Sequence, residues 1–224
     1  MIALLSVRYK VRAKKFYTHG WKKESVIYFP AIESYGEGIF IDFDRTIIHD
    51  WINQYKDVIS ERVSHIQHNF DNHKRISQER IISSKFVMIH TFCHLVMKEL
   101  EFLCGYPASS LQERLYVSNE MQGMLIYTIA GSEGSYGGLV SLANPLKMVK
   151  IIRSALTRAK DCASDPICYH TDKRGQGAGG TNLAACFSCA LLPETSCEEF
   201  NAFLDRRLVI DSEYGYFKDA ISVN

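Results

Sequence analysis

The distribution of hydrophobic and polar residues in the first third of the chain predicts several strands followed by a helix. Residues 2–12, 25–29 and 38–44 are short segments rich in β-branched and aromatic side chains, as is typical of strands. From residue 48 onward, apolar side chains recur at steps of three and four residues, which predicts one helical face over about six turns. That face consists of Ile48, Trp51, Ile52, Tyr55, Val58, Ile59, Val63 and Ile66.

A second helix is expected from just after His73 to Cys104, because Gly105 and Pro107 supply a helix stop signal. The second half of this segment is apolar on nearly all sides, so the helix should lie in the centre of the core. Two strand-like segments, "RLYVS" and "GMLIYTIA", follow it. A glycine-rich segment, "GSEGSYGG" at 131–138, then leads into the last third of the chain.

The last third begins with an amphipathic basic helix predicted at 145–160. Residues 162–197 have little periodicity and predict little regular structure. A final helix is expected from near Cys197 to Arg207, because its start has capping and acidic residues. These residues are Thr195, Ser196, Glu198 and Glu199.

Composition is that of an ordinary globular protein, with 46% hydrophobic and 23% charged residues and a net charge of +1. These values exclude disordered and fibrous classes. The start "MIALLSVRYK" lacks the apolar run of a signal peptide, and "FVMIHTFCHLVMKELEFLC" carries too many polar groups for a membrane span. We therefore expect a cytoplasmic protein without a membrane partner, in a compartment where disulfides are rare.

The densest chemical signal is a cysteine cluster, because five of the seven cysteines lie between residues 162 and 197. Cys186 and Cys189 form a C-x2-C knuckle, whose spacing lets two thiolates reach one ion without strain. The loop "TDKRGQGAGGTN" between the cysteine pieces has no large apolar residue to order it by burial. A structural Zn²⁺ can supply on the order of 10 kcal/mol to a segment of this kind. The alternative is that these cysteines are buried or surface thiols.

Four of the five cysteines would close the coordination sphere, which makes the predicted metal structural and not catalytic. Cys186, Cys189 and Cys197 are the first-ranked ligands. Cys168 is preferred to Cys162 as the fourth.

The whole sequence then predicts an α+β fold, with long core helices packed on a small, mostly antiparallel sheet and a zinc-stapled C-terminal lobe. We divide it into a core at 1–160, a zinc-binding lobe at 161–207 and a C-terminal tail at 208–224.

Two further patterns are weaker indications of chemistry. "HTFCH" places His90 and His94 on one helical face, as in zinc proteases, but Thr91 stands where those enzymes have a glutamate base. Helix-packing histidines are the simpler interpretation, and a substrate or nucleic-acid contact is the alternative. Segment 131–138 has no Walker or dinucleotide-binding pattern and is better explained as a tight turn.

Basic residues gather in two stretches. The first lies within residues 8–23, and the second lies on the helix at 145–160, with Met148, Ile151, Ile152 and Leu156 on its opposite side. A solvated surface is the default interpretation. Phosphate contact is the functional one, without any sign of base-specific recognition. The candidate nucleic-acid-binding residues are Lys147, Lys150, Arg153 and Arg158.

The order of several motifs resembles a known family. "YFPAIESYGEGIFIDFD", "HTFCHLVMKELEFLCGYPASSLQERLYVS", "GMLIYTIAGSEGSYGGLV", "CASDPIC" and "AACFSCALLPETSCEEFNAFLDR" follow one another as in the zinc-binding domain named after the helicase MrfA. The chain is most similar to the C-terminal part of DrmB-type proteins, which are helicase partners in the DISARM anti-phage defence system. This resemblance extends over residues 25–207 and implies zinc ligation by Cys168, Cys186, Cys189 and Cys197. The longer N-terminal part of DrmB-type proteins has no counterpart here.

The resemblance implies a non-catalytic, zinc-binding accessory subunit of a DNA helicase or translocase complex. Its partners would be DNA and a superfamily-two helicase of the DrmA type, and no catalytic residue carries over from the family. The alternative is a metal-dependent hydrolase or nuclease that uses His90 and His94, with Glu113 or Glu133 as acid. A third possibility is a purely architectural subunit.

Overall fold

The computed structural model describes residues 2–14, 21–23, 26–28, 31–73, 80–128 and 138–222. For residues 2–35 it describes the backbone alone. Its elements, in chain order, are β1 (Ile2–Lys14), β2 (Trp21–Lys23), β3 (Val26–Tyr28), β4 (Ala31–Phe43), α1 (Arg45–Gln54), α2 (Lys56–Asp71), α3 (Ser84–Cys104), η1 (Ala108–Ser110), β5 (Leu111–Val117), β6 (Gln122–Thr128), α4 (Leu139–Leu142), α5 (Pro145–Arg158), η2 (Ala178–Gly180), η3 (Glu194–Ser196), α6 (Arg207–Ile210) and α7 (Lys218–Ser222).

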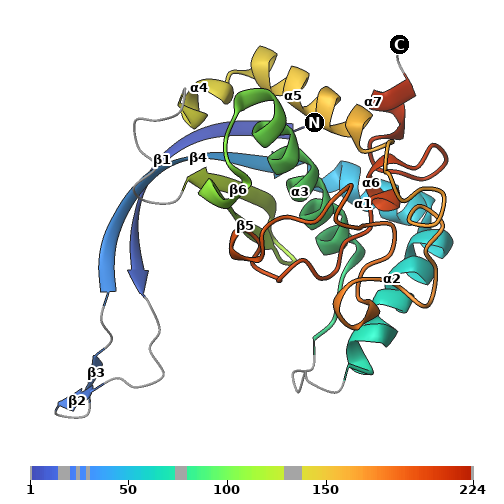
Figure 1. The fold of residues 1–224 in the computed structure, drawn as a ribbon, viewed down its shortest axis with the longest axis horizontal. Coiled ribbons are helices and arrows are strands. Elements are labelled where there is room, and N and C mark those ends of the chain that lie inside the picture. The colour runs from blue at the N-terminus through green and yellow to red at the C-terminus, as the bar shows by residue number, and fades with distance from the viewer. Residues whose placement is uncertain are drawn as a thin grey trace.

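The main sheet has four strands in the order β1-β4-β6-β5, and every pairing within it is antiparallel. β2 and β3 form a separate pair at the far end of the long, curved β1–β4 ribbon (Figure 1). Glycine is required at position 123 of β6 because the Phe40 ring of β4 lies over it, and a Cβ atom there would meet that ring at 2.4 Å. The predicted α+β fold with a small antiparallel sheet is confirmed.

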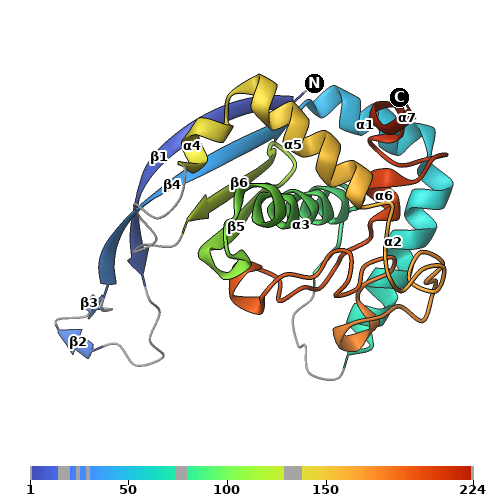
Figure 2. The same ribbon diagram turned by 45° about the horizontal axis from the view of Figure 1, so that its top comes forward.

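α3 lies in the centre of the molecule, with α5 crossing it and the sheet to one side (Figure 2). Its central position follows from its composition, since residues 86–97 are all buried. Ser83 caps the start of α3 by accepting a hydrogen bond from the Phe86 N–H at 3.2 Å. Gly105 ends the helix in the left-handed conformation that glycine adopts without strain.

Three of the expected helices differ in their bounds. The helix expected at 48–66 is broken at Tyr55, which has a φ of −116° and separates α1 from α2. The helix expected to start after His73 starts at Ser84 instead, because residues 80–83 are not helical. The helix predicted at 145–160 is confirmed as α5, with Asn144 as its cap and Pro145 in its first turn.

The final helix predicted from Cys197 to Arg207 is wrong. Phe200, Asn201 and Phe203 have φ values of 50°, 61° and 64°, which a right-handed helix cannot contain. The cause is a contact with a residue nine positions earlier, since the Asn201 side chain donates to the Leu192 carbonyl at 2.7 Å and accepts from the Leu192 N–H at 2.8 Å. This pair of bonds folds the segment into a compact loop.

Residues after 207 pack into the core. Tyr216 makes edge contacts with the rings of Trp51 and Phe43, and Phe217 stacks on Phe92 with ring centroids 4.6 Å apart. The Trp51 Nε1–H donates to the Tyr214 carbonyl at 2.7 Å. Part of the segment predicted as a C-terminal tail is therefore packed against α1 and α3. Within the described part of the chain, every helix is too short or too polar to cross a bilayer.

Candidate metal centre

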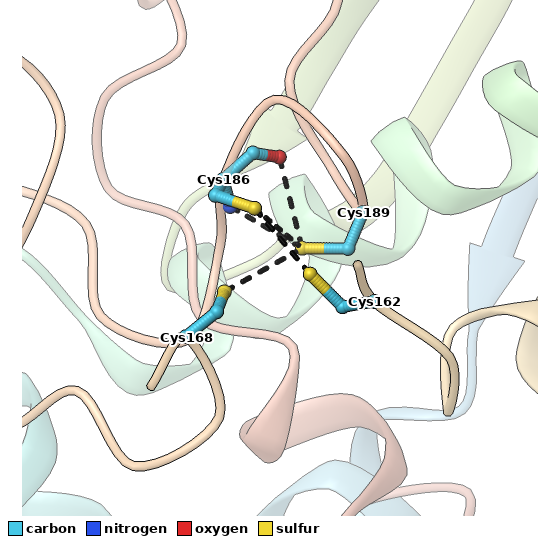
Figure 3. A group of neighbouring side chains, drawn as sticks. All are labelled: Cys162, Cys168, Cys186 and Cys189. Atoms are coloured by element: carbon cyan, nitrogen blue, oxygen red, sulfur yellow. Dashed lines mark hydrogen bonds between the residues drawn. The ribbon is translucent and has the colours of Figure 1, made fainter. Parts of the chain in front are cut away.

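Four cysteine side chains converge on one point at the surface of the C-terminal half (Figure 3). They lie on two pieces of chain on either side of the glycine-rich loop 169–182, and we call them the four-cysteine group. Its members are Cys162, Cys168, Cys186 and Cys189. The second and fourth are buried, and the other two are partly exposed. An ion at this point would thus lie near the surface, with its ligands closing over it.

The spacing of the sulfur atoms fits tetrahedral zinc. The Sγ atoms of Cys162 and Cys186 are 3.4 Å apart, those of Cys168 and Cys189 are 3.8 Å apart, and those of Cys186 and Cys189 are 3.9 Å apart. Four thiolates around one zinc at 2.3 Å would be about 3.8 Å from one another. A disulfide needs about 2.05 Å, so these distances also exclude bonded pairs. The donor set therefore fits a closed, structural zinc site.

Tight turns hold each pair of ligands in place. In the knuckle, the Cys186 carbonyl accepts from the N–H groups of Cys189 and Ala190 at 3.1 and 2.9 Å. The Cys186 N–H in turn donates to the Cys189 Sγ at 3.2 Å. In the first pair, the Asp165 N–H donates to the Cys162 carbonyl at 3.0 Å and the Cys168 N–H donates to the Ser164 carbonyl at 2.9 Å, so two overlapping turns bring both thiols to one side.

Buried polar groups around the sulfurs favour negative charge. The Gln176 side chain donates to the Cys168 Sγ at 3.3 Å. The Arg206 guanidinium is completely buried, donates to the Ala159 carbonyl at 2.8 Å and pairs with Asp165. A hydrogen bond from Cys189 lowers the pKa of Cys168 to about 5, and Gln176 and Arg206 act in the same direction. Arg206 and these donors offset part of the negative charge that four thiolates would bring to zinc.

The loop between the two cysteine pairs is held by hydrogen bonds of its own. Gln176 and Asn182 exchange backbone hydrogen bonds at 2.7 and 3.0 Å. Asn69 of α2 reaches the Gly180 carbonyl at 2.8 Å. Gly175 is required where the loop closes on itself, because a Cβ atom there would lie 1.9 Å from the Gly180 oxygen.

Cys197 lies in a different place from the other four cysteines of the cluster. It joins a second set of buried side chains, which we call the histidine group: His90, His94, Glu113 and Cys197. The structure thus reverses the ranking of Cys197 above Cys162. The reason is the Asn201 loop, whose N–H groups at Glu199 and Asn201 bond the Cys197 Sγ at 3.4 and 3.2 Å and hold it against α3.

The histidine group is electrostatically coupled. Burial alone would raise the pKa of Glu113, but the two histidines hold this pKa well below its usual value. Burial lowers the pKa of His94, which favours the neutral ring that can bind a metal. Burial and the neighbouring Glu113 carboxylate raise the pKa of the Cys197 thiol.

The predicted nucleic-acid contacts lie on α5, and all four side chains are exposed. Arg158, however, is engaged internally, because its Nε donates to the buried Glu99 carboxylate at 2.7 Å and its guanidinium lies 3.5 Å from the centre of the Phe102 ring. Lys147, Lys150 and Arg153 have no ion pair within the described residues, and we call these three the basic face of α5. The side chains of the basic stretch near residue 8 and most of segment 131–138, including Glu133, lie outside the described residues.

Comparison with known proteins agrees with this geometry. Residues 92–190 match the family model described as the MrfA Zn-binding domain. The matched range contains the whole four-cysteine group and ends before Cys197. The chain contains a MrfA-type zinc-binding domain.

The MrfA-type domain also has a curated relative. The chain is 38% identical over 196 residues to the DISARM protein DrmB of Bacillus paralicheniformis (strain ATCC 9945a / NCIMB 11709 / CD-2). The alignment includes 84% of this chain but 34% of the relative, so the chain spans about one third of the relative's length. The resemblance inferred from the sequence motifs is therefore confirmed.

The sequence also contained a signal for the histidine group, which lies partly outside the range that matches the MrfA-type domain. In β5, Leu111 and Glu113 point to the core side and Gln112 does not, so an acid occupies an inward position of the alternation. An acid on the inner face of a strand, beside a helix with histidines four residues apart, is a pattern for a shared buried site. No comparable sequence pattern indicated Arg206, because its position behind the cysteines depends on how the preceding loop folds.

Proposed function

We propose that this chain is a non-catalytic, zinc-binding accessory subunit of a DNA helicase or translocase complex in DISARM-like anti-phage defence. In that complex it would help its helicase partner to hold or load DNA. The observation that carries the proposal is the combination of a closed four-cysteine group with 38% identity to a DISARM protein. A site whose four ligands are all thiolates leaves no open position for a substrate or water, which supports a structural use of the metal.

Contact with DNA would be made through the basic face of α5. Two apolar side chains of the same helix, Leu146 and Val149, are 78% and 46% exposed beside it. A surface that mixes free cations with exposed apolar groups suits a phosphate backbone held next to a protein partner. Because Arg158 is engaged by Glu99, the proposal rests on Lys147, Lys150 and Arg153.

The helicase partnership is tested by co-expression of this chain with a DrmA-type, superfamily-two helicase. The pair should co-purify, and the chain alone should hydrolyse no ATP. Failure of the two proteins to associate, with or without DNA, would refute the partnership. ATP hydrolysis by the isolated chain would refute the non-catalytic assignment.

The DNA contact is tested by salt dependence and charge reversal. Three phosphate contacts predict a slope of about −2.7 in a plot of log affinity against log salt, or roughly a 40-fold loss between 50 and 200 mM salt. The double variant Lys150→Glu, Arg153→Glu should bind weakly and reduce the slope to about −0.9.

A matched control, Lys173→Glu with Arg174→Glu, makes the same change in net charge at two exposed positions of the cysteine loop. Equal loss in both variants would show that net charge, and not this face, determines binding. Retained DNA binding in the α5 variant would refute this face as the contact, whereas a purely architectural role should survive the change.

The hydrolase alternative depends on His90 and His94, which the structure does bring together with Glu113. All of these side chains are buried, with 0%, 0% and 2% exposure. A catalytic metal needs an open position for water and a path for the substrate. Metal-dependent cleavage of DNA that is lost in His94→Ala would favour the hydrolase over our proposal.

A further inference from the structure

The histidine group joins three separate parts of the chain at one buried point. His90 and His94 come from α3, Glu113 from β5, and Cys197 from the loop after η3. The His90 Nε2 atom is 3.1 Å from Glu113 Oε1 and 3.3 Å from Cys197 Sγ. All the donor atoms of the group lie within 4.8 Å of one another. These are side chains that bind metals, and they point inward together.

Three side-chain atoms of this group lack a hydrogen-bond partner among the described residues: His90 Nδ1, His94 Nε2 and Glu113 Oε2. His94 Nε2 and Glu113 Oε2 face each other at 3.5 Å, and neither has a hydrogen-bond partner among the residues that the structure describes. Buried polar atoms in native proteins are nearly always satisfied, so an unsatisfied pair indicates an absent partner. A cation between these two atoms would satisfy both.

The surroundings of the group also resemble those of a metal site. His94 directs its other nitrogen, Nδ1, to the Ala190 carbonyl at 2.9 Å, which turns Nε2 toward the group. Two backbone N–H groups bond the Cys197 Sγ, and the Glu198 N–H donates to Glu113 Oε1 at 3.2 Å. Ligands of bound metals are typically oriented by such outer hydrogen bonds.

We propose that the histidine group binds a second zinc ion in a closed site of two histidines, one glutamate and one cysteine. Tetrahedral zinc with these ligands places neighbouring donor atoms about 3.3 to 3.6 Å apart, close to the 3.1 to 3.5 Å found here. One carboxylate and one thiolate balance the charge of Zn²⁺, so the filled site is neutral in a buried environment. With four protein ligands, all less than 7% exposed, the site would be structural.

This second site is independent of the proposed defence role. The range that matches the zinc-binding family ends at residue 190, before Cys197. The second ion would clamp β5 and the Cys197 loop to α3, in a place that the first ion does not reach. Failure of the helicase or DNA experiments would therefore leave this inference intact, and its own failure would leave the four-cysteine group intact.

The first experiment uses the unmodified full chain, purified without added metal chelators. Elemental analysis should give two zinc ions per chain. X-ray absorption at the zinc edge should give an average of about 2.5 sulfur and about 1.5 nitrogen or oxygen ligands. One zinc per chain with sulfur ligands alone would overturn the proposal.

The second experiment assigns the ions with matched variants. Cys197→Ser and His94→Ala should each retain one zinc, now with four sulfur ligands. Cys189→Ala should retain the other, with one sulfur and three lighter ligands. Thr91→Val is the control for lost stability, because Thr91 is equally buried on α3 but lies outside the group, and it should keep two zinc ions. Two zinc ions in both His94→Ala and Cys197→Ser would overturn the proposal. If these variants do not fold, the sulfur average of the unmodified chain decides.

Discussion

Replacement of Cys189 by alanine is the most direct test of the four-cysteine group. This thiol is 6% exposed, its Sγ lies 3.8 and 3.9 Å from those of Cys168 and Cys186, and it accepts the Cys186 N–H. The substitution removes one of four ligands and leaves that N–H without its acceptor. We expect the segment from 162 to 189 to lose its zinc and its fixed structure.

The expected magnitude follows from a comparison of two free energies. Structural zinc contributes about 10–16 kcal/mol in small metal-dependent folds, whereas a whole domain is typically stable by about 5–15 kcal/mol. The unsatisfied N–H adds about 1–3 kcal/mol to the cost. Even partial loss of the metal contribution is therefore enough to unfold the lobe, although the core around α3 can persist with its own packing.

The assay combines zinc content with hydrogen exchange. Amide protons between residues 162 and 189 should exchange much faster in Cys189→Ala than in the unmodified chain, and treatment with a chelator should reproduce this pattern. Cys93→Ala is the matched control, because Cys93 is a buried cysteine of α3 outside both groups. Full zinc content and unchanged protection in Cys189→Ala would refute the assignment of these cysteines as ligands.

Three further outcomes are expected. Asp205→Ala should lower the free energy of unfolding by about 3–5 kcal/mol in urea titrations, because it leaves the buried Arg62 without the carboxylate that binds it at 2.6 and 2.9 Å; the double variant with Arg62→Met should cost less than the two single changes together. Arg158→Ala should lower stability by about 1–3 kcal/mol through the buried Glu99, with unchanged DNA affinity in a binding titration. The lobe should also release zinc, and its melting temperature should fall, as the pH is lowered. Unfolded cysteines keep their protons up to a pH of about 8.5, whereas zinc-bound thiolates carry none. The unfolded state therefore binds more protons, and the stability of the lobe rises with pH over this range. A melting temperature that is independent of pH between about 5 and 8 would contradict metal ligation.

The sequence predicted those elements that are determined by helix capping and by the periodicity of apolar residues. α5 has a capping Asn144, a proline in its first turn and a regular apolar stripe, and its observed bounds differ from the predicted ones by two residues. The centre of α3 was also predictable, because a segment that is apolar all round has to be buried. Its start was not, since the residues before Ser83 contain no breaker that marks the end of the helical pattern.

The prediction of the final helix was wrong because the observed loop depends on hydrogen bonds that local helix signals do not reveal. Thr195, Ser196 and the two glutamates are favourable at a helix start, but Asn201 bonds both backbone groups of Leu192, and this requires left-handed residues around it. Such bonds join positions that are nine residues apart and depend on the fold. The energetic preference of capping residues, about 1 kcal/mol, is smaller than the loss of two buried hydrogen bonds.

The convergence of four cysteines of the cluster was predictable from the sequence, but not which four converge. Spacing along the chain favours Cys197, which is eight residues after Cys189, over Cys162, which is more than twenty residues before the knuckle. The fold inverts this order, because the loop at 169–182 folds back on itself through Gln176 and Asn182 and returns residues 162–168 to the knuckle. Sequence distance is therefore a poor guide to ligation when a closed loop separates the ligands.

The chain that follows the knuckle explains why the two groups belong to one folded unit. Ala190, one residue after Cys189, accepts the hydrogen bond that orients His94. Further on, the Asp205 backbone N–H donates to Thr91, the neighbour of His90, while the Asp205 carboxylate accepts from the Ala184 N–H close to the knuckle. Each end of the segment from 184 to 205 is thus tied both to the cysteine side and to α3. These bonds attach the cysteine lobe to α3, so order imposed on the cysteines by a metal would also help to position the segment that packs on α3.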